Sequence, residues 1–234
     1  MDTDPLEGRS TMNRKLSAIL IALVLAISGC CSMARFGTTT VQGSGRVASE
    51  TRRLGRFTSI VIQNSADVDV TLGDTGSATI EAEDNLLPYI ETRVWLGRLT
   101  IRTRPLASIS TTRPIHIMVT TRSLDSVSLQ GSGNVRATDL NGKALRVRLP
   151  GSGTITATGT VDNLRISLGG SGDVTCSSLQ AKTATVNLDG SGNVKVYASE
   201  RLDATLSGSG NIQYAGSPAT VRPRISGSGH ITPQ

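Results

Sequence analysis

Four arginines supply the clearest binding chemistry in this sequence: Arg136, Arg146, Arg148 and Arg165. Arg146 and Arg148 alternate with aliphatic residues, and Arg165 takes the place of Arg146 one repeat later. A planar guanidinium donates two parallel hydrogen bonds to a carboxylate or phosphate. We expect the four side chains to lie about 5 to 10 Å apart in stacked strands and to form a patch for anionic ligands. The alternative is a solvated strand face, where arginine only discourages aggregation.

Carboxylates and histidines do not form a catalytic or metal-binding pattern. A polysaccharide hydrolase or lyase needs paired carboxylates at matching heights on adjacent coils. The aspartates here fall at scattered repeat positions: Asp125, Asp139, Asp162, Asp189 and Asp203. His116 and His230 have no partner at metal-ligand spacing. We therefore expect no catalytic residue, metal or cofactor, and keep a polysaccharide-acting enzyme as a minor alternative. A calcium-binding nonapeptide roll is disfavoured because Asp173 stands one place too early.

A repeat organises the elements that must position these side chains. Gly-Ser-Gly begins at Gly131, Gly151, Gly170, Gly190, Gly208 and Gly227, at steps of 18 to 20 residues, and also at Gly43. The residue two places before is always aliphatic: Leu129, Leu149, Leu168, Leu188, Leu206 and Ile225. So is the residue four places after: Val135, Ile155, Val174, Val194, Ile212 and Ile231. A fixed period near 19 indicates a solenoid.

Apolar and polar residues alternate on both sides of each glycine corner, which predicts two half-buried strands per repeat. Stacked repeats place identical positions about 4.8 Å apart, so that leucine lies on leucine. We predict an all-β fold, a parallel β-solenoid with coils of about 19 residues, regular over 126–234 and irregular over 41–125. In the irregular half, 59–68 aligns without a gap on 126–135. We expect Tyr89 and Trp95, in that half, to cover one end of the core.

The N-terminus predicts export and lipidation. Arg14 and Lys15 precede an apolar run over 16–27, and Ile27-Ser28-Gly29-Cys30 resembles a lipobox. Twelve helical residues rise only about 18 Å, too short for a permanent transmembrane helix. We expect a signal peptide over 1–29 with translation starting at Met12, and a tether over 30–40. Cys30 would carry the acyl chains, palmitate among them, that anchor the protein to a membrane. The next residue is not Asp, which favours the outer membrane if the host has one.

Composition narrows the partners. The net charge is +6 and aromatic residues make up 3% of the chain. So few aromatics disfavour nucleic-acid binding through base stacking. A basic exported protein meets anionic envelope or host glycans and phospholipid more readily. Cys176 takes a core-facing strand position, so we expect a small buried residue and not a reactive thiol.

Several segments resemble a known family. They are Phe57-Thr58-Ser59-Ile60 leading into Val68-Asp69-Val70, Asp84-Asn85-Leu86-Leu87 followed by Leu99-Thr100-Ile101, and the serial Gly-Ser-Gly-Asn-Val turns. Over 41–230 the chain resembles bacterial lipoproteins described as "putative auto-transporter adhesin, head GIN domain". The resemblance implies a right-handed, single-stranded parallel β-helix-like fold and a place in the bacterial cell envelope. It implies no catalytic or ligand-binding residues.

Two functional hypotheses follow. The favoured one is a non-catalytic, adhesin-like module that is anchored in the envelope and binds a repetitive envelope or host polymer. The other is a structural protein that self-associates through coil ends or edges, as an uncapped solenoid can.

Overall fold

The computed structural model describes residues 39–234. The expected signal peptide, Cys30 and most of the expected tether lie outside the described residues. Among residues 39–234 no helix has the length and apolar character needed to cross a membrane. The hydrophobic core lies within this part and extends from Phe57 to Ile231. Residues 39–234 therefore have a hydrophobic core of their own, as an independent domain does.

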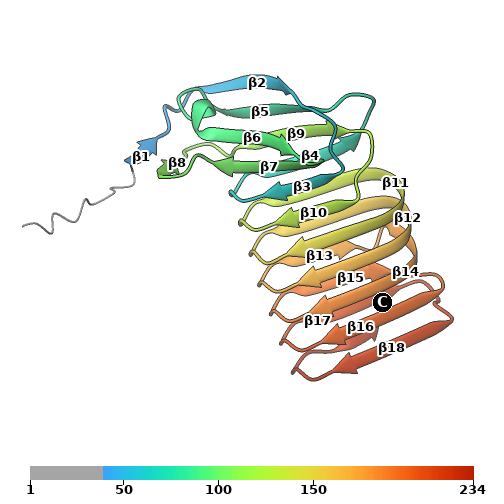
Figure 1. Ribbon diagram of the computed structural model, residues 1–234. Helices are drawn as coiled ribbons and strands as arrows, with labels where there is room; N and C mark the ends of the chain where they lie inside the picture. The colour runs from blue at the N-terminus through green and yellow to red at the C-terminus, as the bar shows by residue number, and fades with distance from the viewer. Residues whose placement is uncertain (1–38) are drawn as a thin grey trace, which may run out of the picture. The chain divides into compact units, whose positions relative to one another are not determined.

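The regular coils are stacks of parallel strands (Figure 1). They are β10 (Ser126–Leu129), β11 (Asn134–Leu149), β12 (Thr154–Leu168), β13 (Asp173–Cys176), β14 (Leu179–Leu188), β15 (Asn193–Tyr197), β16 (Arg201–Leu206), β17 (Asn211–Ala215), β18 (Thr220–Ile225) and β19 (Ile231–Pro233). One face of the stack consists of β10, the C-terminal parts of β11 and β12, β14, β16 and β18. The other consists of the N-terminal parts of β11 and β12, then β13, β15, β17 and β19. The predicted all-β parallel solenoid is confirmed.

The aliphatic columns form the core as the alternation predicts. Leu149, Leu168, Leu188 and Leu206 are directly opposite one another on successive coils, and each is 0% exposed. Burying a leucine side chain stabilises a fold by about 1.5 to 3 kcal/mol. The last member of the column, Ile225, is 52% exposed, because in the described chain it pairs only with Leu206 of the preceding coil. The column therefore holds the coils in register.

The glycine corners stack through the backbone. The N–H groups of Ser191, Ser209 and Ser228 each donate to a glycine carbonyl of the preceding coil at 3.1 Å. A Cβ on Gly192 would overlap the carbonyl oxygen of Gly172, and the same holds along the column. Glycine is required here because the coils approach too closely for any side chain.

A second corner bends the long strands β11 and β12. Asp139 has φ 56° and the register shifts between Ala137 and Leu140. On the next coil Gly159, with φ 124°, lies opposite Leu140. Aspartate tolerates a left-handed backbone better than most residues. This bend passes each strand from one face of the stack to the other.

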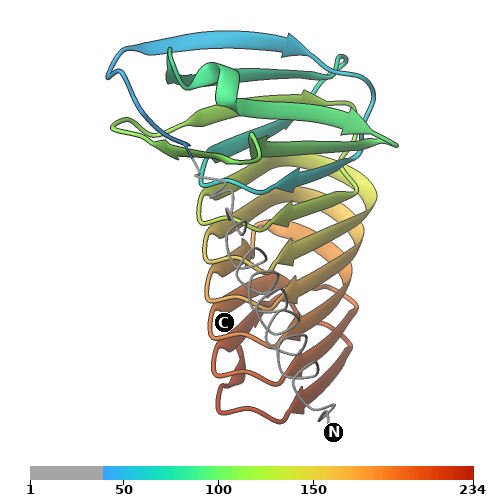
Figure 2. The same cartoon turned by 60° about the vertical axis from the view of Figure 1, so that its left-hand side comes forward.

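The irregular half forms a cap in which stacking order departs from chain order (Figure 2). Its elements are β1 (Thr39–Gln42), β2 (Val47–Arg53), β3 (Ser59–Ile62), β4 (Asp67–Leu72), β5 (Ser77–Glu83), η1 (Leu87–Tyr89), β6 (Ile90–Trp95), β7 (Arg98–Thr103), β8 (Ala107–Ser110) and β9 (His116–Thr121). The predicted alignment is confirmed, because Ser59 lies opposite Ser126 and Val68 opposite Val135. The later strands β7 and β9 then pair with the outer side of β3 and β4.

Antiparallel strands close the outer end of the cap. β5 pairs with β9, β2 pairs with β5, and β6 pairs with β7. In the described chain β2 pairs only with β5 and β6 only with β7, so these two strands form the outer edges of the cap. The prediction that Trp95 covers the core is wrong, because its side chain is 67% exposed at the tip of the β6–β7 hairpin. Buried Leu86, Ile90 and Ile80 fill this end of the core instead.

Candidate anionic-ligand site

Three of the four predicted arginines share one face of the stack. Arg146 on β11 lies directly opposite Arg165 on β12, and Arg148 lies opposite Ser167. All three arginines are exposed, because their neighbours in sequence point into the core. We call Arg146, Arg148 and Arg165 the arginine triad.

The arginine triad borders a shallow groove of about 620 Å³. Ser167 and Asn187, from the next two coils, also line this groove and add neutral hydrogen-bonding groups. An adjoining groove of about 450 Å³ shares Arg146 and Arg165 and is lined further by Thr183. Donors on strands about 4.8 Å apart can contact successive anionic groups of an extended ligand.

The triad carries an excess of positive charge, and Asp125 is the one acid that lines either groove. Within residues 39–234 none of its three guanidinium groups is paired with a carboxylate. Asp203, two coils from Arg165, is bound by Arg201 at 2.7 Å. Like charges that face each other across strands are destabilising. An anion bound between Arg146 and Arg165 would convert this repulsion into attraction.

Arg136 lies apart from the triad. It is on the N-terminal part of β11, before the bend at Asp139, where it faces Asp69 on β4 and Thr156 on β12. Its Nε lies 3.9 Å from Asp69 Oδ1. The four arginines therefore do not form a single patch, because the bend in β11 places Arg136 on the other face.

That other face carries a ladder of polar side chains at the corner. The Asn193 backbone N–H and side-chain amide donate to Asp173 Oδ1 at 2.8 and 3.1 Å. Asn211 Nδ2 donates to Asn193 Oδ1 at 3.2 Å, and the His230 backbone N–H donates to Asn211 Oδ1 at 3.1 Å. These side chains bond from coil to coil along the stack. The ladder therefore has a structural role that the sequence pattern did not reveal.

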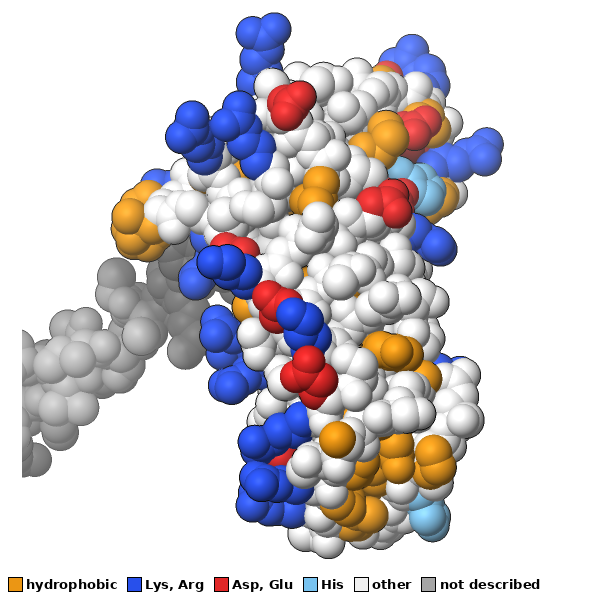
Figure 3. All heavy atoms as spheres, turned by 90° about the vertical axis from the view of Figure 1, so that its right-hand side faces the viewer, with side chains coloured by type: hydrophobic (Ala, Val, Ile, Leu, Met, Phe, Trp, Pro, Cys, Tyr) orange, Lys and Arg blue, Asp and Glu red, His pale blue; other side chains and the backbone are white. Residues whose placement is uncertain are grey.

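Near the second bend, charges of opposite sign follow one another along the stack. The β11–β12–β14–β16 register aligns Lys143, Asp162, Lys182 and Glu200. Lys182 Nζ lies 2.8 Å from Asp162 Oδ1, and this hydrogen bond and the attraction of Asp162 raise the pKa of Lys182. Basic and acidic side chains alternate across this side in Figure 3. Here, unlike at the triad, the charges are compensated.

The comparisons with known proteins are consistent with this architecture. The family model for "Putative auto-transporter adhesin, head GIN domain" matches residues 56–218. The chain belongs to this family. No curated protein is significantly similar to it.

Three solved structures have a similar fold. A "putative adhesin" from Bacteroides fragilis has 20% identity and a TM-score of 0.67, covering 83% of this chain and 100% of its own. A "Putative lipid binding protein" from Parabacteroides distasonis has 25% identity and a TM-score of 0.57, covering 84% and 100%. A "putative adhesin" from Parabacteroides merdae has 18% identity and a TM-score of 0.50, covering 83% and 99%.

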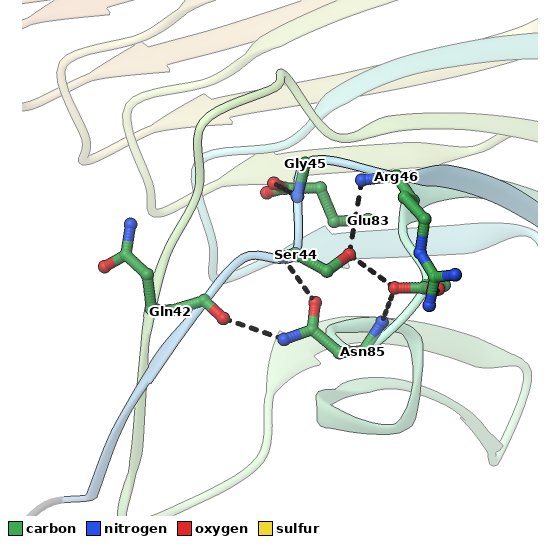
Figure 4. Close-up of polar contacts among 7 residues, drawn as sticks. Gln42, Ser44, Gly45, Arg46, Glu83 and Asn85 are labelled. Carbon is green, nitrogen blue, oxygen red and sulfur yellow. Dashed lines mark hydrogen bonds and ion pairs between the residues drawn. The ribbon is translucent and has the colours of Figure 1, made fainter.

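In this GIN-domain chain, Glu83, Asp84 and Asn85 bind polar groups of distant segments (Figure 4). We call this set of contacts the polar clasp. Glu83 is 1% exposed and accepts hydrogen bonds from the Gly45 N–H and from Thr112 Oγ1, both at 2.7 Å. The hydrogen bond from the Thr112 side chain is the main cause that lowers the pKa of Glu83, and hydrogen bonds from backbone N–H groups lower it further. Buried carboxylates with several donors are stabilised in the charged form. Glu83 thus joins the β1–β2 turn to the β8–β9 loop.

The rest of the clasp fixes the first Gly-Ser-Gly. Ser44 Oγ donates to Asp84 Oδ1, and the Ser44 N–H donates to Asn85 Oδ1 at 2.9 Å. Asn85 Nδ2 donates to the Gln42 carbonyl at 2.7 Å. Every donor is already engaged within the chain, so the clasp is structural. Sequence reasoning placed this run in the irregular half without a role of its own, and the only signal for the clasp was the adjacency of Glu83, Asp84 and Asn85.

The remaining reactive side chains include a buried cysteine and an exposed histidine. Cys176 is 0% exposed, and burial raises the pKa of its thiol to about 12. The expectation of a small buried residue is confirmed. Exposed His116 faces Asp67 across β9 and β4. In the described part of the chain no three His, Cys, Asp or Glu residues gather as a metal site.

Proposed function

We propose that this protein is a non-catalytic binding module of the bacterial cell envelope, whose arginine triad binds anionic groups of a repeating polymer. The observation that carries the proposal is the direct opposition of Arg146 and Arg165 without a carboxylate partner among residues 39–234. The core does not need these charges, since both side chains are exposed. An anionic glycan, from the envelope or from a host, has the charge and the repetition to match.

The relatives support binding over catalysis. The family and two of the neighbours are described as adhesins, and one neighbour as lipid-binding. Lipidation at Cys30 and, in a host with two membranes, an outer-membrane location belong to the same proposal. A membrane anchor would hold the module where envelope polymers are concentrated. Mass spectrometry of the protein isolated from its host would test the anchor through the mass of the N-terminal peptide.

The binding proposal is tested by replacing Arg146, Arg148 and Arg165 together with serine. At low salt we expect affinity for purified lipopolysaccharide to fall at least about tenfold, since charge-assisted hydrogen bonds are lost. The matched control replaces Arg136, Lys143 and Lys195 with serine, which removes the same charge from elsewhere. Equal affinities for the two variants, or equal binding of neutral dextran by wild type, would contradict the proposal.

The ends of the solenoid do not favour the alternative of self-assembly. At the cap the outermost strand, β2, runs antiparallel to its neighbour β5, so this edge does not continue the parallel coils that end at β18 and β19. At the other end, the Thr220 and Ser226 N–H groups donate inward to the preceding coil. In a parallel ladder alternate residues face opposite sides, so the nitrogen of Pro223 faces the open edge. Proline has no N–H to offer there and interrupts pairing with a second chain.

A further inference from the structure

The tip of the β6–β7 hairpin exposes two large apolar side chains. Trp95 is 67% exposed and Leu96 is 82% exposed; among the other large hydrophobic residues of the described chain only Leu106, at 67%, is as exposed as Trp95. Leu96 and Gly97 have φ angles of 46° and 73°, so the tip is a tight turn and not a loose loop. Figure 2 shows the hairpin at the margin of the cap. An indole and an isobutyl group are thus held in solvent by rigid backbone.

The hairpin is firmly packed behind its tip. Val94 packs against the core and Leu99, opposite it, is fully buried. Trp95 therefore points to the outer side of the hairpin, together with Arg98 opposite it and Arg93 two residues earlier. Strand alternation requires this arrangement. One surface of the hairpin consequently presents apolar and basic side chains side by side.

A basic cleft adjoins the hairpin. The Thr58 N–H donates to the Gly97 carbonyl at 3.0 Å, which joins the tip to the loop over residues 54–58. Beyond this loop lies a cleft of about 730 Å³, lined by Arg53, Arg56 and Arg122 and by one acid, Asp74. Arg122 Nε donates to the backbone carbonyl of Asp74 at 2.6 Å. The cleft therefore carries an excess of positive charge.

None of these five arginines, Arg53, Arg56, Arg93, Arg98 and Arg122, is paired with a carboxylate in residues 39–234. In Figure 3 basic side chains gather over the cap at the top of the molecule. The exposed Leu106 differs, because nearby Arg104 is paired with Glu91 at 3.6 Å. The apolar tip and the unpaired charges thus coincide at only this end of the cap, within the described chain.

We propose that this end of the cap docks on an anionic lipid bilayer, with Trp95 and Leu96 in the interface and the arginines on lipid phosphates. Tryptophan is favoured at the boundary between hydrocarbon and water because its ring is amphipathic. Arginine stems can lie along apolar surface while their guanidinium groups reach the headgroups. Each basic residue near an anionic membrane strengthens binding by a factor of about five. This surface is separate from the arginine triad.

The chain contains one tryptophan, so its fluorescence reports on the docking surface alone. Residues 32–234, which include the hydrophobic core of the described chain and lack Cys30, are mixed with vesicles of phosphatidylglycerol and phosphatidylcholine. We expect a blue shift of the emission and co-flotation of protein with the vesicles. Vesicles of phosphatidylcholine alone should produce neither. Absence of both effects with anionic vesicles at low salt would overturn the proposal.

Variants locate the contact. Trp95→Ser with Leu96→Ser should reduce flotation about tenfold or more, since two apolar side chains no longer enter the interface. Leu106→Ser with Met118→Ser, a matched loss of exposed apolar surface, should float like wild type. Replacing Arg53, Arg56 and Arg122 with serine should weaken flotation about a hundredfold. Equal flotation of the hairpin variant and its control would place the contact elsewhere and refute docking through this tip.

Two further arms separate related explanations. A blue shift of equal size with inorganic phosphate or with monomeric short-chain phosphatidylglycerol would indicate a single-ligand cleft and refute bilayer docking. The triad variant, with serine at 146, 148 and 165, should float like wild type. Unreduced glycan binding by the triad variant would contradict the proposed function alone, and absence of wild-type flotation with anionic vesicles would contradict this inference alone.

Discussion

Gly192 approaches the carbonyl oxygen of Gly172 so closely that no side chain fits between the two coils at that corner. The same contact recurs between Gly172 and Gly153, so it is a property of the stack. Gly192→Ala should lower the free energy of unfolding by at least about 1 to 3 kcal/mol through overpacking. Urea denaturation measures this. Gly169→Ala is the control, because a Cβ there meets nothing within 4 Å. Equal midpoints for the two variants would contradict the close stacking.

The leucine column should not tolerate charge. Leu188→Asp places a carboxylate at a position that is 0% exposed and has no cation beside it, so the fold should be lost or destabilised by several kcal/mol, on the order of 3 to 5. Circular dichroism during heating measures the loss. Asn187→Asp, exposed on the adjacent residue, should melt close to wild type. A folded Leu188→Asp protein with an unchanged melting temperature would be incompatible with this core.

Acidification should destabilise the cap through Glu83. Hydrogen bonds, that of Thr112 foremost, lower the pKa of Glu83 below 4.5 in the folded state. A carboxyl with a lowered folded pKa contributes stability that is complete above the unfolded pKa and is lost as pH falls through the folded pKa. Urea midpoints should therefore fall below about pH 4.5.

The Glu83→Gln variant should show a shallower fall over the same range and a lower midpoint at neutral pH, because an amide nitrogen cannot accept these hydrogen bonds. Glu81→Gln, exposed on the same strand, is the matched control and should follow wild type. If Glu83→Gln retained the full pH dependence of wild type, the clasp would not be the origin of the effect.

Pro223 should keep the protein monomeric by blocking strand pairing at the open edge of β18. Pro223→Thr restores an N–H at the open edge of β18, where the next coil would pair. Sedimentation velocity over a range of concentrations should show larger species for this variant and a monomer for wild type. Pro105→Ser, in an exposed loop, serves as control. A monomeric Pro223→Thr protein at every concentration would show that this proline does not guard the edge.

The sequence alone determined the coil and its core. Identical positions recur every 18 to 20 residues, so the columns of Leu168 and Val174 had to face inward and stack. The same alternation put Arg146, Arg148 and Arg165 outside and Cys176 inside. Even the alignment of Ser59 on Ser126 followed from pattern. These features are local or periodic, and hydrophobic alternation encodes them directly.

Tertiary structure alone decided the bend, the cap and the clasp. Asp139 bends β11 through a left-handed backbone conformation, and this bend separates Arg136 from the triad. The sequence did not indicate the bend, because the residue there is not a glycine. β7 and β9 pair outside the earlier β3 and β4, so Trp95 lies exposed at a hairpin tip and not over the core. Glu83 meets Gly45 and Thr112 from distant segments. Such contacts join residues far apart in the chain, and the packing of the whole fold decides which of them form. Periodicity specifies which side of a strand is buried, but it does not specify which distant strand will lie beside it.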